Sequence, residues 1–481
     1  MEKTEETYKI GDVKPPLPIK PMPEAPTTFG EWFKKFGPAL IVTSLGISGF
    51  EAMQAPLSGS IGLLKISWIY TLGCTFAVIA AYEIARWTIA TGEDIFQGFA
   101  RLKPKHFWAI VWFLINTLMW IWPVWMGAAA TNVARLFGIG DRIIWTIIGI
   151  WLVPILYALA RYVYNLMEWI FKIVMIATTI ATIYAAIVII GNFPADTIEV
   201  LKGFFSFGII PSGVSVTLMT AYLVQPGGGT INLYYSFYLR EKGIGMCKYI
   251  GKVTGLFYSP EEVPETGFMF NAKDEKERKS FRNWMKYALF ENIMTLWLLS
   301  MLFTYIYILA AYSTLWRAGI KLPSGDIPLG IAESLGKMVG PIGYSFFLFS
   351  VAFSLFDTQF GFYDAMAKVA ADTLWYEWTG YARRKSYRFW YFLFLLITVA
   401  ISTPLIWLAQ PYFMWLFLQV FLAASAAIYL PLIVYMNNKY LPEEIKPNKI
   451  ISALLLIWGI INLIFTILWI GENVFKIKII A

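Results

Sequence analysis

Long apolar segments dominate this sequence and limit what it can fold into. A helix needs about 20 consecutive apolar residues to cross a bilayer, and eleven such stretches follow one another along the 481 residues. Charged residues make up only 15% of the chain, whereas soluble domains carry about 25%. We therefore predict an all-α, multi-pass membrane protein with spans at residues 38–62, 66–90, 107–133, 142–160, 167–191, 204–240, 286–312, 341–367, 387–408, 411–436 and 450–473.

Two of these spans, the first and the sixth, are interrupted by residues that weaken a helix. Ser48, Gly49 and Glu51 fall in the middle of the first span, and Gly227–Gly229 fall in the sixth. Gly and Ser make unwinding easy, and unwound backbone at bilayer depth persists only where it faces protein or water. Two interrupted spans in matching positions of two halves indicate the substrate site of a transporter.

The same positions predict how the chain is divided. If span six repeats span one, the chain consists of two inverted five-helix repeats and one extra span, which is the LeuT-type fold with helices 1 and 6 broken. The repeats are then residues 36–200 and 201–436, and the eleventh span and the C-terminus occupy residues 437–481.

The distribution of positive charge predicts the orientation in the membrane. The stretch from Arg240 to Lys286 carries ten Lys and Arg side chains, and cytoplasmic loops are enriched in these residues. We expect a cytoplasmic N-terminus, an external C-terminus and the plasma membrane of a prokaryote. Topology then explains the net charge of +8, so we expect membrane lipid as a partner, no nucleic acid and no obligate protein partner.

The N-terminus and the rare residue types narrow the possibilities further. Residues 1–35 are polar and rich in proline, without a cleavable signal sequence, so we expect a disordered cytoplasmic tail. The chain has one His and two Cys, which leaves little for a metal site built from these residues. No Walker-type motif, nucleophile elbow or His-Glu-x-x-His motif is present. We therefore expect no enzyme activity and no cofactor.

Several short motifs resemble those of the Nramp transporters. They are the Gly37-Pro38 start of the first span, the Ala85-Arg86 and Thr91-Gly92 pairs that follow it, Asn232-Leu233-Tyr234 in span six and Leu418-Gln419-Val420 in span ten. The resemblance extends in spacing over residues 36–436. It implies a LeuT-type fold and secondary transport of divalent cations.

The chain also departs from the Nramp pattern where that family binds metal and moves protons. The family's Asp-Pro-Gly-Asn motif corresponds to Ser48–Glu51, so the carboxylate lies about one helical turn later. Its Met-Pro-His motif corresponds to Gly229–Ile231, which removes the soft thioether ligand. Its two acids in span three correspond to Ile121 and Val124. The resemblance therefore implies an altered metal site and weak or absent proton coupling.

Glu51 is the leading candidate ligand because a carboxylate at bilayer depth is costly unless it serves a function. Ser48, Glu51 and Gln54 share one helical face, and the span-six glycines can expose carbonyls to a hard cation. The alternatives are a structural Glu51 that is protonated or bonded to freed backbone amides, and a close helix crossing at the glycines. The full set of candidate substrate or metal ligands is Ser48, Glu51, Gln54, Gln225, Gly227, Gly228, Gly229, Thr230, Asn232 and Gln419.

Other polar residues within the spans have several interpretations. Asp357 in span eight is a possible second ligand, a coupling site or the partner of a buried donor. Gln419 is equally well explained by an interhelical hydrogen bond. The spacing of Glu83 and Arg86, of Glu168 and Lys172, and of Asp364 and Lys368 predicts structural ion pairs, the last of them near the membrane interface.

Three functions remain open on this evidence. The first is a transporter of divalent metal ions of the Nramp type, with a hard ion such as magnesium or manganese as substrate. The second is a LeuT-fold carrier of a non-metal solute, such as an organic cation or amino acid. The third is a membrane sensor or scaffold that transports nothing. The oxygen-rich candidate site favours the first.

Overall fold

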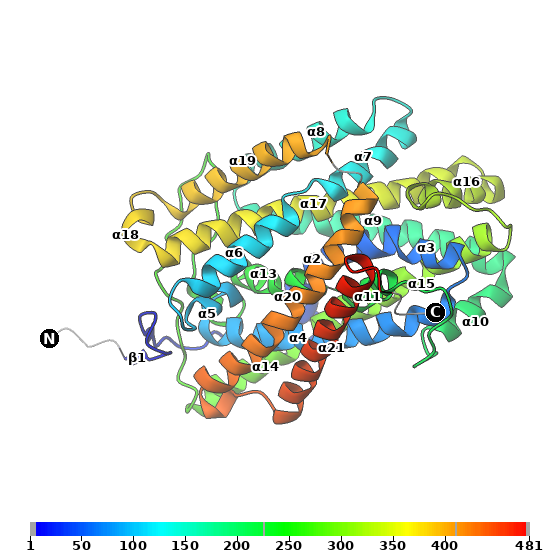
Figure 1. The fold of residues 1–481 in the computed structure, drawn as a ribbon. Coiled ribbons are helices and arrows are strands. Elements are labelled where there is room, and N and C mark those ends of the chain that lie inside the picture. Colours follow the sequence, from blue (N-terminus) through cyan, green and yellow to red (C-terminus); the bar gives the residue numbers. More distant parts are fainter. Residues whose placement is uncertain (1–5, 225–226, 409–410, 478–481) are drawn as a thin grey trace.

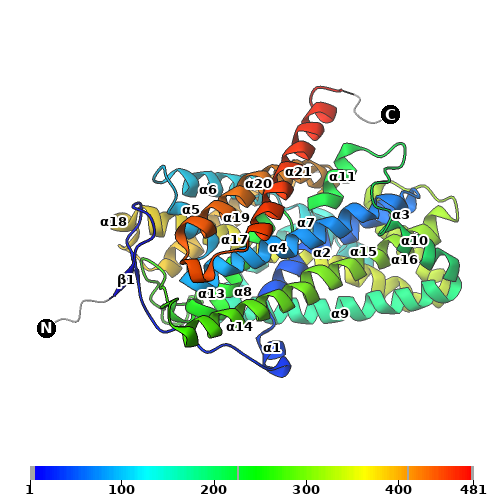
Figure 2. The ribbon, with the colours of Figure 1, turned by 90° about the horizontal axis from the view of Figure 1, so that it is seen from below.

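The protein is a bundle of long helices that run between two ends of the molecule (Figures 1 and 2). This computed structural model describes residues 6–224, 227–408 and 411–477, without the side chains of 47–49, 52, 53, 324 and 411–417. Within that part, nine helices are long and apolar enough to cross a membrane. They comprise α4 (Ser67–Thr91), α6 with α7 (Phe107–Trp120, Val124–Phe137), α8 (Arg142–Leu159), α9 (Val163–Asn192), α14 with α15 (Glu275–Asn292, Ser300–Ala311), α17 (Pro341–Glu377), α19 (Tyr387–Leu405), α20 (Pro411–Tyr440) and α21 (Lys449–Asn473).

These nine helices match nine of the eleven predicted spans, and the other two are the interrupted ones. Helix α17 is central, since 72% of its most apolar 18-residue segment is buried, whereas only 28% of the corresponding segment of α21 is buried. It packs against α2, α7, α9 and α19, whereas α21 packs mainly on α20. Shorter elements complete the fold: α1 (Phe29–Lys35), α2 (Pro38–Met53), α3 (Ala55–Ser60), α5 (Ile95–Ala100), α10 (Pro194–Gly203), α11 (Val216–Val224), α12 (Thr230–Leu233), α13 (Tyr235–Lys242), α16 (Ile327–Val339), α18 (Thr379–Ala382), β1 (Thr7–Tyr8) and β2 (Leu17–Pro18).

Span one is interrupted later than predicted. Helix α2 continues through Ser48, Gly49 and Glu51, and the chain leaves it only at Gln54 before α3 begins. Pro56 explains this position, because proline has no amide hydrogen for the helix ladder and its ring crowds the carbonyl four residues earlier. The placement of the interruption at Ser48–Glu51 was therefore wrong, and proline outweighs the preferences of Ser and Gly.

Span six is interrupted at the predicted glycines, but it begins later than expected. Residues 204–215 lie outside helix α11, although we placed them within the span. Gly227 and Gly229 have φ of +56° and +60°, which only glycine adopts readily. A Cβ on Gly229 would lie 2.8 Å from the Cα of Leu422 in α20. Both the backbone conformation and the close approach of α20 therefore require glycine.

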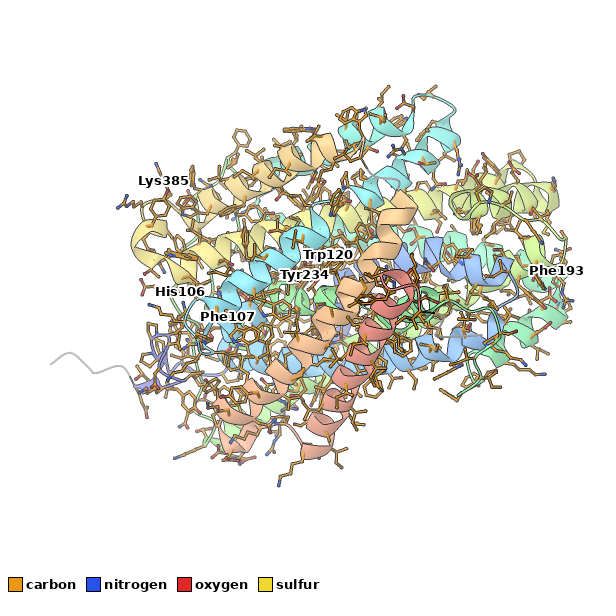
Figure 3. All side chains as sticks on the ribbon, viewed as in Figure 1. His106, Phe107, Trp120, Phe193, Tyr234 and Lys385 are labelled. Atoms are coloured by element: carbon orange, nitrogen blue, oxygen red, sulfur yellow. The ribbon has the colours of Figure 1, made fainter. Side chains whose placement is uncertain are left out.

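Span three also contains an interruption that the hydropathy did not predict. Helix α6 ends at Trp120, and α7 starts after Pro123. Proline again supplies the reason, since it cannot donate to the preceding helical turn. The result is that Trp120, on the last turn of α6, lies at the centre of the bundle together with Tyr234 (Figure 3).

The N-terminal arm, residues 6–28, is ordered in the structure instead of disordered. It forms the β1–β2 hairpin, and the amide of Lys20 donates to the carbonyl of Met269 at 2.8 Å. The amide of Met22 donates to Glu277 at 3.1 Å, and Lys14 lies 2.6 Å from Glu377. These contacts correct the expectation of a disordered tail, because Met269 and α14 satisfy backbone amides of the arm and α17 binds the side chain of Lys14. The arm covers one end of the bundle (Figure 1).

Candidate functional site

Most buried carboxylates in the described part of the chain are neutralised by a positive side chain within 4.0 Å. These paired acids are Glu83, Glu93, Asp94, Glu168, Asp196, Glu241, Asp364, Asp372 and Glu377. Among the described residues, three buried acids lack such a pair: Glu51, Glu291 and Asp357. An uncompensated buried charge is costly, so each of these acids must be protonated, satisfied by hydrogen-bond donors or neutralised by an external cation.

Glu51 lies on the last turn of α2 and is 1% exposed. One carboxylate oxygen accepts a hydrogen bond from the hydroxyl of Tyr70 in α4 and another, of 3.4 Å, from Thr304 in α15. The second oxygen, Oε2, has no hydrogen-bond partner among the described residues. Two hydroxyl donors therefore hold one oxygen of Glu51 in place, and the other oxygen is available to a ligand.

Gln54 lies one turn after Glu51, where α2 gives way to α3. Its side chain is fully buried, and neither the oxygen nor the nitrogen of its amide has a partner among the described residues. Unpaired buried amides are rare in folded proteins. Glu51 and Gln54 therefore each present an oxygen atom without a described hydrogen-bond partner at the interruption of span one.

Aromatic rings pack beside this pair. Phe50 stacks on Tyr70 with ring centroids 4.9 Å apart and meets Tyr222 of α11 edge-on at 4.7 Å. The hydroxyl of Tyr222 shares a hydrogen bond with Ser58 in α3. The aromatic packing joins both interrupted spans next to Glu51.

The candidate ligands of span six face other helices. Thr230 accepts a hydrogen bond of 3.0 Å from Trp120, and the amide nitrogen of Asn232 donates to the carbonyl of Ala77 at 2.9 Å. Gly229 lies against α20, whose Gln419 is fully buried. The polar contacts of Glu51 go instead to α4 and α15. The polar contacts of Thr230 and Asn232 thus go to α6 and α4, whereas Gly227 lies beside Val42 of α2.

Asp357 lies on α17, opposite the first half of α2. It is fully buried and accepts a hydrogen bond of 2.6 Å from the hydroxyl of Ser44. Thr358 lies 3.5 Å from its other oxygen and 3.4 Å from the backbone carbonyl of Ser44. Carboxylate, hydroxyl and carbonyl oxygens from two helices therefore meet at this acid, which we predicted as a coupling or second site.

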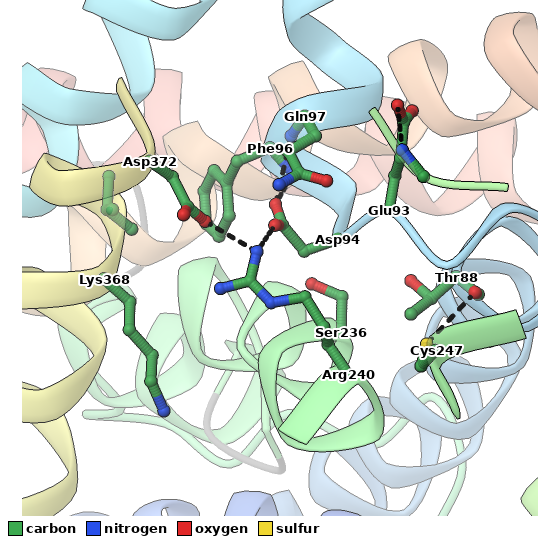
Figure 4. Close-up of polar contacts among 12 residues, drawn as sticks. Thr88, Glu93, Asp94, Phe96, Gln97, Ser236, Arg240, Cys247, Lys368 and Asp372 are labelled. Carbon is green, nitrogen blue, oxygen red and sulfur yellow. Dashed lines mark hydrogen bonds and ion pairs between the residues drawn. The ribbon is translucent and has the colours of Figure 1, made fainter. Parts of the chain in front are cut away.

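The predicted ion pairs are present, and one is deeper than expected. Arg86 lies 2.9 Å from Glu83, and Lys172 lies 2.5 Å from Glu168. Lys368 lies 2.9 Å from Asp364, but both side chains are fully buried instead of interfacial. Nearby, Arg240 at the end of span six lies between Asp94 and Asp372, as Figure 4 shows. These pairs tie the end of span six to α17 and to the start of α5.

Sequence reasoning missed four residues that contribute to these sites. Glu291 on α14 accepts a hydrogen bond of 2.7 Å from the amide of Gly37 and so caps the start of α2. Its position in an apolar span is the signal that should have identified it. Tyr70, Thr304 and Ser44 gave no such signal, because hydroxyl residues are common in membrane helices.

Two predicted ligands fall outside what the structure describes: Gln225, and the side chain of Ser48. The part of the chain that is described contains no group of three or more His, Cys, Asp or Glu side chains able to hold a metal ion. Any cation at Glu51 would therefore depend on amide, hydroxyl and carbonyl oxygens in addition to the carboxylate.

Comparisons with known proteins identify the family. The family model described as Nramp, natural resistance-associated macrophage protein-like, matches residues 58–471. A search of curated protein sequences gives no match.

Solved transporter structures share the fold. The manganese transporter of Eremococcus coleocola, in complex with an aromatic bis-isothiourea substituted compound, aligns with a TM-score of 0.62 at 14% identity, over 95% of this chain and 91% of that chain. A histidine-to-alanine mutant of that transporter gives a TM-score of 0.63 at the same identity and coverage. Mhp1, a nucleobase-cation-symport-1 family transporter in a closed conformation with bromovinylhydantoin bound, gives 0.50 at 14% identity, over 94% and 95% of the two chains.

The prediction of a LeuT-type fold with two five-helix repeats and an extra span is confirmed. Because the family match covers most of the sequence, this integral, multi-pass membrane protein belongs to the Nramp family.

Proposed function

We propose that this protein is a secondary transporter of divalent metal cations with an altered binding site, in which Glu51 supplies the negative charge. The observation that carries the proposal is that Glu51 is buried and, among the described residues, has no positive partner within 4.0 Å and one carboxylate oxygen without a hydrogen bond. The family match begins at residue 58, so the role of Glu51 is argued from its own contacts. We also propose that the protein lies in the plasma membrane of a prokaryote, and the positively charged loops support a cytoplasmic N-terminus.

The chemistry of the site favours a hard cation. Glu51, Gln54 and Thr304 offer oxygen atoms, and the proposed ligand set contains no thioether. Oxygen ligands suit magnesium and manganese, whereas sulfur ligands favour softer metals. The similarity in fold to a manganese transporter adds support for a metal as substrate.

Replacement of Glu51 tests this proposal directly. Glu51→Gln keeps the size of the side chain but removes its charge, so manganese uptake into proteoliposomes should fall at least about tenfold, because one charged interaction is worth roughly 1.5–3 kcal/mol. The melting temperature should hardly change, since a neutral amide is easier to bury.

Glu377→Gln is the matched control. Glu377 is a buried glutamate that pairs with Lys14 and His106 at the end of α17. This variant should lose stability but keep its uptake per folded molecule. Normal uptake by Glu51→Gln would remove Glu51 from the site, and a large loss of stability without loss of uptake would make it a structural residue.

We also propose that proton coupling is weak. Ile121 and Val124 cannot carry protons, and the next two acids after Asp357 along α17 are held in ion pairs with Lys368 and Arg240. Manganese uptake should therefore cause little acidification inside proteoliposomes, as followed with a pH-sensitive dye. A strong metal-dependent acidification that disappears in Asp357→Asn would contradict this and assign a proton route to Asp357.

The aromatic packing beside Glu51 favours a second candidate function. A carboxylate next to Phe50, Tyr70 and Tyr222 is also suited to an organic cation, which aromatic faces attract. Uptake of an organic cation that manganese does not inhibit would support this alternative and count against the metal site.

A further inference from the structure

A cavity lined by charged and aromatic side chains lies at the end of the bundle covered by the N-terminal arm. It has a volume of about 310 Å³ and lies where the start of α6, the end of α20 and the hairpin of the arm meet. The residues used in the argument are Asp12, Arg101, Lys103, Trp108, Tyr435 and Lys439. None of the residues that line the cavity belongs to the proposed transport site.

The wall formed by α20 changes from apolar to charged along the helix axis. Leu432, Tyr435 and Lys439 follow each other on one face, with spacings of three and four residues. The seven-position step from Leu432 to Lys439 rises about 10 Å along the helix. Along the wall, an apolar side chain is followed by a tyrosine and then by a cation. This order complements a phospholipid, in which apolar chains are followed by the glycerol and then by an anionic phosphate.

The wall on the side of α6 repeats this order. Trp108 lies on the first turn of α6, and Lys103 lies just before the helix. The side chain of Lys103 is 76% exposed, and Lys439 lies over the ring of Tyr435 at 4.7 Å. Two lysines, one from the segment before α6 and one from α20, thus line the same opening, each with an aromatic residue nearby.

Arg101 forms part of the cavity, but its charge is already paired with Glu93. Its Nε and one terminal nitrogen bind Glu93 at 2.8 and 2.6 Å, and the other terminal nitrogen donates to the carbonyl of Pro15 at 3.0 Å. It therefore fixes the arm, and the two lysines supply the charge for a ligand.

Asp12 on the arm already responds to this positive charge. Its carboxylate lies 3.0 Å from Lys9 and 3.8 Å from Lys103. Hydrogen bonding and attraction from Lys9, followed by attraction from Lys103 and Lys439, lower the pKa of Asp12. Asp12 is therefore ionised at neutral pH and competes with any other anion at the opening.

We propose that this cavity binds the phosphate of an anionic phospholipid, with Lys103 and Lys439 as its ligands and Trp108 and Tyr435 against the glycerol and upper acyl region. Basic pockets at the ends of membrane helices are suited to such headgroups. The carboxylate of Asp12 opposes binding, so its removal strengthens the site. The proposal is independent of the transported substrate.

Lipid binding to the full-length protein tests this inference. Detergent-purified protein is titrated with phosphatidylglycerol or phosphatidylcholine, and bound lipid is counted by native mass spectrometry. Wild-type protein should retain one phosphatidylglycerol at least about fivefold more tightly than phosphatidylcholine. Lys103→Ala combined with Lys439→Ala should abolish that preference, and Asp12→Asn should increase the affinity at least about twofold.

The control variants separate a built site from general attraction. Lys321→Ala combined with Lys337→Ala removes two lysines near α16, at the opposite end of the molecule, and should leave the lipid preference unchanged. An equal loss in both double variants would overturn the proposal, and so would retention of phosphatidylglycerol in the Lys103 and Lys439 variant. Displacement of the lipid by millimolar inorganic phosphate would assign the cavity to free phosphate and contradict a lipid site.

Discussion

At the scale of single residues, the strength of the hydrogen bond from Tyr70 depends on whether Glu51 is ionised. A hydrogen bond to an ionised group is worth about 1.5–3 kcal/mol, and a neutral one about 0.5–1.5 kcal/mol. Tyr70 donates to Glu51, whereas Tyr222, buried in the same aromatic group, bonds the neutral hydroxyl of Ser58. Comparing substitutions of the two tyrosines therefore shows whether Glu51 is charged.

Replacing each tyrosine by phenylalanine turns this comparison into a prediction. If Glu51 is ionised and awaits a cation, Tyr70→Phe should lower the thermal stability clearly more than Tyr222→Phe. It should also weaken manganese binding, because Glu51 loses the donor that orients it. Equal losses of stability, followed by thermal unfolding in the same detergent, would indicate a neutral Glu51.

At the scale of elements, prolines and glycines determine where helices stop. The conformation of Gly229, with φ of +60° and ψ of −143°, is essentially restricted to glycine. An added Cβ would also crowd Leu422. Gly229→Ala should therefore destabilise the protein by strain and overpacking together, each of about 1–3 kcal/mol.

Gly138 provides the comparison for this prediction. It ends α7 with φ of +68°, but no atom lies within 4 Å of a Cβ built there. Gly138→Ala should carry only the backbone strain, about 1–2 kcal/mol. The melting temperature of Gly229→Ala should be well below that of Gly138→Ala. The reverse order would mean that α20 moves away from span six easily.

The elements also explain how far the sequence could be interpreted. Hydropathy identified the spans because the bilayer sets their length, and three consecutive glycines indicated the unwound part of span six. The interruption of span one was misplaced because Ser48 and Gly49 were weighted above Pro56. The partners of Glu51 and Asp357 were not predictable, since Tyr70, Thr304 and Ser44 gain their roles only when distant helices pack together.

At the scale of the whole molecule, the N-terminal arm connects helices of both repeats. Its Lys14 lies 2.6 Å from Glu377, and the side chains are 12% and 0% exposed. Removing one partner of a buried ion pair costs about 3–5 kcal/mol. The pair of Lys9 and Asp12 is 75% and 65% exposed, and such pairs contribute about 0–1 kcal/mol.

Lys14→Ala should therefore release the arm, and Lys9→Ala should not. Limited proteolysis followed by mass spectrometry of the N-terminal fragments measures this release. Cleavage of residues 6–28 should become much faster in Lys14→Ala, while the transmembrane core stays intact. Similar cleavage of both variants would show that the backbone contacts of the arm, rather than Lys14, hold it in place.

The contacts of the arm also determine when it can dock during synthesis. The hydroxyl of Tyr8 donates to the carbonyl of Tyr440, 432 positions later in the chain. The side chain of Lys14 bonds Tyr376 and Glu377, which are also made late. The N-terminus leaves the ribosome first, yet its binding surface is complete only after ten spans have been made. The segment that is synthesised first can therefore complete its contacts only after the tenth span has been made.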